Sequence, residues 1–162
     1  SQSGSAITLE DQDRSLWDRK LIAEGNILLE AALRKARPGP FQIEAAIAST
    51  HTQAETYATT DWVEIDRLYR ALEHIRPSPV VALNRAVVQA KLNGAQAGLC
   101  SLEQLAGSLE RYPNFHVVRA TFLEELGLLE EAQAAYCKAL EFAGTDVDRD
   151  HIRRKMKVSG GQ

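Results

Sequence analysis

A helical pattern of apolar residues returns along this chain at an interval of 34 and then 33 residues. The equivalent positions are Ile65, Leu99 and Ala132, then Leu68, Leu102 and Ala135, then Leu72, Ala106 and Ala139. A single pair of helices cannot bury its apolar face alone, so pairs that repeat at this interval stack and share one continuous core. The interval therefore predicts a surface that holds another protein rather than an enclosed catalytic cleft.

An interval near 34 residues is the spacing of tetratricopeptide (TPR) helix hairpins. We therefore predict an all-α fold, a TPR-like right-handed stack of about eight helices. A long N-terminal helix precedes roughly three hairpins, and a short helix closes the stack. Turn and capping residues give the expected helices: Thr8 to about Ala36, Phe41 to Tyr57, Trp62 to Ile75 after a capping Asp61, Pro79 onward after a capping Ser78, a fifth from Gly94 through Leu109, a sixth from Pro113 through Leu126, Leu129 to Phe142, and Val147 to Met156.

The length of 162 residues suits one domain. We expect a flexible leader or expression remnant at residues 1–7, a single TPR-like domain over 8–157 and a disordered tail at 158–162. The net charge of −3 argues against a nucleic-acid-binding module, which usually carries a basic excess. Cys100 and Cys137 lie in separate helical patterns, and no long apolar run or secretory signal is present. We expect reduced thiols and a cytoplasmic protein.

The densest polar group lies near the start of the chain, where Asp11, Asp13 and Arg14 are followed by Trp17 and Asp18. Oxygen ligands at such spacing could bind a divalent cation. On a helix, however, Asp11 and Asp13 would point about 200° apart, whereas Asp11, Arg14 and Asp18 would share one face and form ion pairs. A salt-bridge ladder is the favoured interpretation, ahead of a partner-contact patch and of a metal or catalytic site.

Nothing else in the sequence indicates an enzyme. The four histidines, His51, His74, His116 and His151, have no neighbour at metal-ligand spacing, and no motif identifies a nucleophile or a phosphate loop. We interpret His51 as a buried, hydrogen-bonded histidine. The sequence predicts no catalytic residue, no metal and no cofactor.

Asn84 and Arg85 are expected on the inner helix of the second hairpin, the helix that lines the groove of a TPR array. Arg85 could pair with a carboxylate of a bound peptide. Alternatively, Asn84 bonds across helices and Arg85 pairs with a local acid. Both interpretations stay open. Glu103 stands where Tyr69 and Tyr136 would predict an aromatic residue, so the middle hairpin is a degenerate repeat.

Several stretches carry a family resemblance. They are Asp11 through Asp18, Gln42 with Ala45 through Ala48, Asp61-Trp62 with Ile65 through Leu72, and Pro77 through Val87, the most specific. From about Leu9 to Arg153 the chain resembles the long C-terminal TPR-like extension of some bacterial extracytoplasmic-function (ECF) RNA polymerase sigma factors. The sigma regions that bind core polymerase and promoter DNA are upstream in that family and are not in this chain.

The resemblance implies an accessory domain that acts by protein contact. Its expected partners are the sigma regions of the parent protein, core polymerase or a signalling protein, with DNA contacted by the parent and not by this segment. A dimer is an open alternative. The candidate contact or intramolecular docking residues are Asp11, Asp13, Arg14, Trp17, Asp18, Asn84 and Arg85. The alternatives are a free-standing TPR adaptor that binds peptide tails and, less favoured, a metal-dependent enzyme using the aspartate group.

Overall fold

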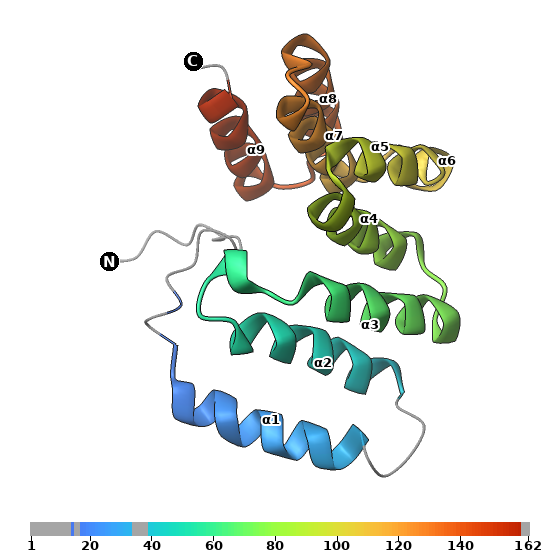
Figure 1. Ribbon diagram of the computed structural model, residues 1–162. Helices are drawn as coiled ribbons and strands as arrows, with labels where there is room; N and C mark the ends of the chain where they lie inside the picture. The colour runs from blue at the N-terminus through green and yellow to red at the C-terminus, as the bar shows by residue number, and fades with distance from the viewer. Residues whose placement is uncertain (1–13, 15–16, 34–38, 160–162) are drawn as a thin grey trace. The chain divides into compact units, whose positions relative to one another are not determined.

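The computed structural model describes Arg14, residues 17–33 and residues 39–159, and within these ranges the chain forms helices and no strand (Figure 1). The all-α class predicted from the sequence is therefore confirmed. The elements are α1 (Arg19–Leu33), α2 (Pro40–Gln53), the 3₁₀ turn η2 (Tyr57–Thr59), α3 (Trp62–Ile75), α4 (Pro79–Asn93), α5 (Ala95–Glu103), α6 (Ala106–Leu109), α7 (Pro113–Glu125), α8 (Leu129–Phe142) and α9 (Asp146–Ser159). None of the helices in these ranges has both the length and the apolar character needed to cross a bilayer.

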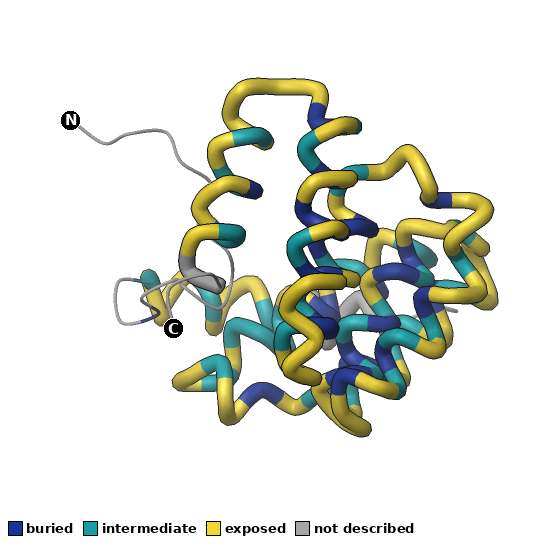
Figure 2. Tube along the Cα trace, turned by 90° about the horizontal axis from the view of Figure 1, so that it is seen from above, coloured by how far each residue is buried: buried dark blue, intermediate teal, exposed yellow. Residues whose placement is uncertain are grey.

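The helices fall into two compact units, an N-terminal unit that ends at Arg85 and a C-terminal unit that begins at Ala86. In the N-terminal unit α1 packs on α2, and α2 packs on α3. In the C-terminal unit α5 packs on α7, α7 on α8, and α8 on α9. Buried, intermediate and exposed residues alternate along the helices, as expected where one side packs and the other meets solvent (Figure 2).

The first helix begins later than predicted. α1 starts at Arg19 because Asp18 Oδ1 accepts hydrogen bonds from the backbone N–H groups of Lys20 (3.0 Å) and Leu21 (3.2 Å). An aspartate in this place satisfies donors that have no partner within the helix. The predicted cap Thr8 lies outside the described residues, but a continuous helix through Asp18 is wrong.

The second helix also ends earlier than predicted. α2 stops at Gln53, and Ala54 adopts an extended conformation. Thr56 and Thr59 then cap η2 reciprocally, each side chain bonding the other residue's backbone N–H. Asp61 caps α3 as predicted, since its Oδ1 accepts a hydrogen bond from the Glu64 N–H at 3.0 Å.

The two predicted glycine turns are confirmed. Gly94, with φ 89°, separates α4 from α5, and Gly127, with φ 76°, separates α7 from α8. A positive φ in this region is readily adopted only by glycine. The two turns repeat at the predicted interval, and helix α8 has the predicted bounds.

The middle repeat departs from the pattern, as Glu103 indicated. The predicted fifth helix is interrupted after Glu103, where the Leu105 N–H bonds back three residues to Leu102, and it resumes as α6. Gly107 and Ser108 are weak helix formers, which favours the interruption. Ala106 is consequently exposed instead of buried. Because of this break, the described residues contain nine α-helices rather than about eight.

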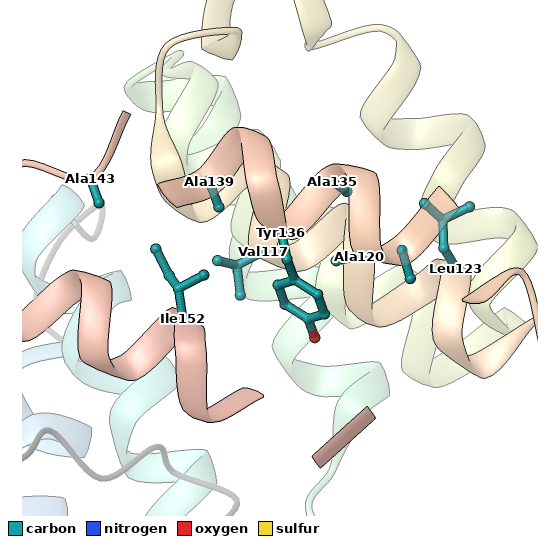
Figure 3. Close-up of a cluster of buried hydrophobic side chains, with 9 residues drawn as sticks. Val117, Ala120, Leu123, Ala135, Tyr136, Ala139, Ala143 and Ile152 are labelled. Carbon is teal, nitrogen blue, oxygen red and sulfur yellow. The ribbon is translucent and has the colours of Figure 1, made fainter. Parts of the chain in front are cut away.

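The C-terminal unit has a core of small and large side chains from α7, α8 and α9 (Figure 3). Its members are Val117, Ala120, Leu123, Ala132, Ala135, Tyr136, Ala139, Ala143 and Ile152. The alanines of α8 allow close packing, and Tyr136 fills the space between the helices. Burial, followed by the Glu124 carboxylate that bonds the hydroxyl, raises the pKa of Tyr136. The predicted buried positions Ala132, Tyr136 and Ala139 are confirmed.

Some predicted core residues lie elsewhere. Ile75 and Leu126 were expected to be buried but are exposed, since they end α3 and adjoin the turn after α7. On α7, Val117 is buried more fully than the predicted Val118. Because α7 is covered by α5 on one side and α8 on another, its buried face is broader than a single stripe.

Candidate functional site

Arg14 is a buried guanidinium at the end of α2. Its side chain is 4% exposed, and its Nη1 donates to the backbone carbonyl oxygens of His51 (2.6 Å), Ala54 (3.1 Å) and Thr56 (3.3 Å). The last carbonyls of a helix have no partner within it, and a positive charge there is favoured by the helix dipole. Arg14 therefore fastens the segment before α1 to the end of α2.

Aromatic rings surround this guanidinium. The Arg14 Cζ atom lies 5.3 Å from the ring centroid of Trp17 and 5.9 Å from that of Tyr57, within the range of cation–π attraction. The Trp62 ring meets Tyr57 and His51 edge to face, with centroids 5.0 Å and 5.4 Å apart. These five residues, Arg14, Trp17, His51, Tyr57 and Trp62, form an arginine–aromatic cluster that joins three segments of the N-terminal unit.

His51 is the one titratable ring of this cluster. It is half-buried, and burial, together with the nearby Arg14 charge, lowers its pKa. Its Nδ1 atom has no hydrogen-bond partner among the described residues, so the predicted hydrogen-bonded histidine is wrong for this nitrogen. The neutral ring is favoured because a charged one would be desolvated beside a guanidinium.

The predicted salt-bridge ladder is wrong where it can be examined. Arg14 bonds carbonyls of α2 and its neighbourhood, and Asp18 caps α1, so these two residues do not share a helix face. Asp11 and Asp13 lie outside the described residues. Within the described ranges, no group of three or more His, Cys, Asp or Glu side chains is placed to hold a metal ion. Cys100 and Cys137 are free, exposed thiols.

Arg85 is engaged within its own unit. Its Nε donates to Asp66 Oδ1 at 3.0 Å, and its Nη1 donates to Glu73 Oε2 at 2.6 Å. Asp66 also accepts from Arg70 at 2.9 Å, and it is buried. Two carboxylates therefore hold the Arg85 guanidinium between α3 and α4. Pairing with local acids, one of the two open interpretations of Arg85, is what the structure contains.

Asn84, the neighbour of Arg85, is exposed at a groove of about 250 Å³ in the N-terminal unit. Buried apolar residues from three helices form part of its lining, namely Ile47 of α2, Leu72 of α3 and Val81 of α4. Polar groups line it as well. They are an ion pair between Arg76 Nη2 and Glu44 Oε1 at 3.0 Å, Tyr69, Ser78 and Asn84 itself. We call this hollow the Asn84 groove.

The electrostatics of the Asn84 groove are mixed. Tyr69 is mostly withdrawn from solvent, and burial followed by the Glu44 carboxylate raises its pKa, so the phenol stays protonated and can donate a hydrogen bond. The amide of Asn84 both donates and accepts. An apolar lining with a few polar groups suits a short peptide segment or the side chain of a partner protein.

The predicted site residues thus separate into distinct places. Arg14 and Trp17 share the arginine–aromatic cluster, Asp18 caps α1, Arg85 is in an ion-pair network, and Asn84 borders a groove. Sequence reasoning missed Glu44, Tyr69 and Arg76 as groove residues. The one signal was the alignment of Tyr69 with Tyr136, which marked an aromatic position but not its exposure.

Comparisons with known proteins give a limited picture. Residues 1–33 match a protein family described as a family of unknown function (DUF6596). Over 154 residues, 95% of this chain, the sequence is 44% identical to a protein of Rhizobium meliloti (strain 1021) named uncharacterized protein R00370. The chain spans 36% of the length of that relative. No solved structure matches the chain.

Proposed function

We propose that this chain is a non-catalytic, protein-binding accessory domain of an ECF-type RNA polymerase sigma factor. It tunes initiation by packing on the sigma regions of the parent protein, on core polymerase or on a signalling protein. The mechanism is a shift in population between states of the parent that expose different contact surfaces. A ligand of the domain changes that balance only through a difference in its affinity for the two states.

Three features support this proposal. The motif string from Asp11 to Val87 resembles the extension of such sigma factors, and the chain corresponds to about a third of a longer relative. The described helices pack in succession within each unit, the arrangement of repeat proteins that bind other proteins. The resemblance and the longer relative together favour a domain that works beside others in one polypeptide.

The observation that carries the proposal furthest is the contrast between Asn84 and Arg85 within the most specific motif. Arg85 is used inside the N-terminal unit, where it neutralises Asp66 and Glu73. Asn84 has no such use and stays exposed at a groove with an apolar lining. An exposed polar residue beside apolar surface is typical of a contact site, whereas a buried ion-pair network is typical of a structural joint.

The experiment is transcription by core polymerase with the parent protein carrying Asn84→Trp, which fills the Asn84 groove with a bulky ring. The matched control is Val63→Trp, since Val63 is exposed on α3 in the same unit and does not line the groove. We expect N84W to change activity or partner binding while V63W matches the unmodified parent. If N84W leaves activity, promoter choice and partner binding unchanged in a folded protein, this groove is not the contact surface.

A further inference from the structure

A second hollow, of about 550 Å³, lies within the C-terminal unit. Residues of α5, α6, α7 and α8 line it, with Leu99, Phe115, Leu123 and Leu128 supplying apolar surface. We call it the Leu128 groove. Its volume is within the range of sites that take a small ligand or an anchoring side chain.

The Leu128 groove lies at the departure from the repeat pattern. Glu103 stands where an aromatic side chain is found in the other repeats, and the helix interruption after it leaves Ala106 and Gly107 as lining residues. A Cβ atom added to Gly107 would meet no other atom within 4 Å. The small residues therefore leave room that a regular repeat would fill with its own side chains.

The groove is held in shape by a buried histidine. His116 is 3% exposed, its ring stacks on Phe142 with centroids 5.7 Å apart, and its Nε2–H donates to the Glu110 carbonyl oxygen. This bond ties the turn after α6 to α7. A wall fixed in this way loses little conformational entropy when a partner binds.

Acidic side chains dominate around this groove. Glu103, Glu110 and Glu131 line it, against the cations Arg119 and Lys138, and none of these five forms an ion pair with another described residue. Unpaired charge beside apolar surface favours a partner of opposite charge.

The turn between α7 and α8 extends the same character. It presents the exposed leucines Leu126, Leu128 and Leu129, flanked by acids on both sides in the sequence Glu-Glu-Leu-Gly-Leu-Leu-Glu-Glu from Glu124 to Glu131. Leu128 is 42% exposed and also lines the groove. Apolar surface of this kind, with an acidic border, is complementary to a segment that alternates apolar and cationic faces.

We propose that the Leu128 groove binds a cationic amphipathic helix of a protein partner. Its apolar residues at spacings of three and four would enter the groove, and its lysines or arginines would face Glu103, Glu110 and Glu131. The inference deepens the proposed function by naming a surface and the chemistry of the partner, and it relies on that function only in taking the partner to be a protein.

The test is fluorescence anisotropy of two synthetic helical peptides with the full 162-residue chain. Both peptides repeat leucine at the same helical spacing, and the polar face carries lysine in one and glutamate in the other. We expect the lysine peptide to bind at least about tenfold more tightly than the glutamate peptide and to weaken as salt is added. Equal binding of the two peptides, or no binding of either, would overturn the proposal.

Two variants place the binding on the groove. Gly107→Leu occupies the open space while raising helix propensity, and the double charge reversal E103K/E131K removes the acidic border. Each should weaken the lysine peptide by about tenfold or more. The control E24K/E55K makes the same change of net charge on exposed residues of the N-terminal unit and should have little effect.

Unchanged binding to both groove variants, with circular dichroism like that of the wild type, would contradict the assignment. An equal loss in E24K/E55K would show that only net charge matters and would also contradict it. The outcome is independent of transcription, because a parent protein whose activity ignores this domain could still bind the lysine peptide. Such a result would refute the proposed function and leave the groove assignment intact.

Discussion

Replacement of Arg14 by methionine should destabilise the N-terminal unit by about 2 kcal/mol. Arg14 Nη1 has two hydrogens for three carbonyl acceptors, so at most two bonds from a charged donor form at once, each worth about 1.5–3 kcal/mol. Two cation–π contacts contribute about 0.5–1 kcal/mol each. Methionine keeps most of the side-chain volume but loses all of these interactions.

The opposing contribution comes from the same side chain. Arg14 Nε and Nη2 are buried without a hydrogen-bond partner among the described residues, and such a group costs about 1–3 kcal/mol. Methionine removes both costs, so the mid-range values leave a net loss near 2 kcal/mol. Arg14→Lys should lose less, because an ammonium can still bond the carbonyls at the end of α2.

Urea unfolding followed by tryptophan fluorescence measures this loss selectively. The chain has two tryptophans, Trp17 and Trp62, and both lie in the arginine–aromatic cluster. With a slope near 2 kcal/mol per molar urea, the midpoint should fall by about 1 M. The control Arg67→Met removes an exposed arginine paired with a surface glutamate in the same unit and should cost under about 0.5 kcal/mol. An unchanged midpoint for R14M, or an equal fall for R67M, would refute the reasoning.

Three further predictions concern the other joints of the fold. Arg85→Met leaves the buried Asp66 carboxylate short of its partner and should cost about 2–4 kcal/mol in urea unfolding, with the double variant R85M/D66L recovering part of the loss. The pKa of His51 is lowered in the folded chain, so the unfolded chain binds more protons as the pH falls below the ordinary value of 6.5. Stability of the N-terminal unit should therefore fall between pH 7.5 and pH 5, and a urea series at each pH should show a smaller fall for His51→Gln. Gly98→Ala should lower the melting temperature, because its Cβ would come within 2.6 Å of a buried phenylalanine ring, whereas Gly107→Ala should raise it slightly by better helix propensity.

Local signals in the sequence predict the fold well where they act within a few residues. The cap at Asp61, the proline at the start of α4 and the turns at Gly94 and Gly127 depend only on neighbouring backbone groups. Likewise, α8 has its predicted bounds since its small apolar stripe is regular. The 34-residue period adds the stacking of successive helices, which needs no knowledge of individual contacts.

The N-terminal motif could not be interpreted in the same way. Asp11, Arg14 and Asp18 fit a helix face by spacing alone, but the carbonyls that Arg14 binds come from residues about 40 positions later. A single sequence contains no indication of which distant carbonyls lack partners. The contact that fastens this segment is therefore visible only once α2 and η2 are placed.

The grooves are equally hidden from the sequence. Asn84 was identified by resemblance, yet the residues around it come from α2 and α3 as well as α4. The Leu128 groove had one indicator, the degenerate Glu103, which marked an irregular repeat without showing that the irregularity opens a hollow. Side-chain exposure depends on how far neighbouring helices approach, and periodicity does not specify that distance.

Regulation of a sigma factor by this helical domain is tested most directly by removing the domain. The measurement is promoter-dependent transcription by core polymerase, comparing the parent protein with a version that lacks this segment. The account predicts that the shortened protein differs in activity, in promoter choice or in partner binding. Identical behaviour in all three would contradict it.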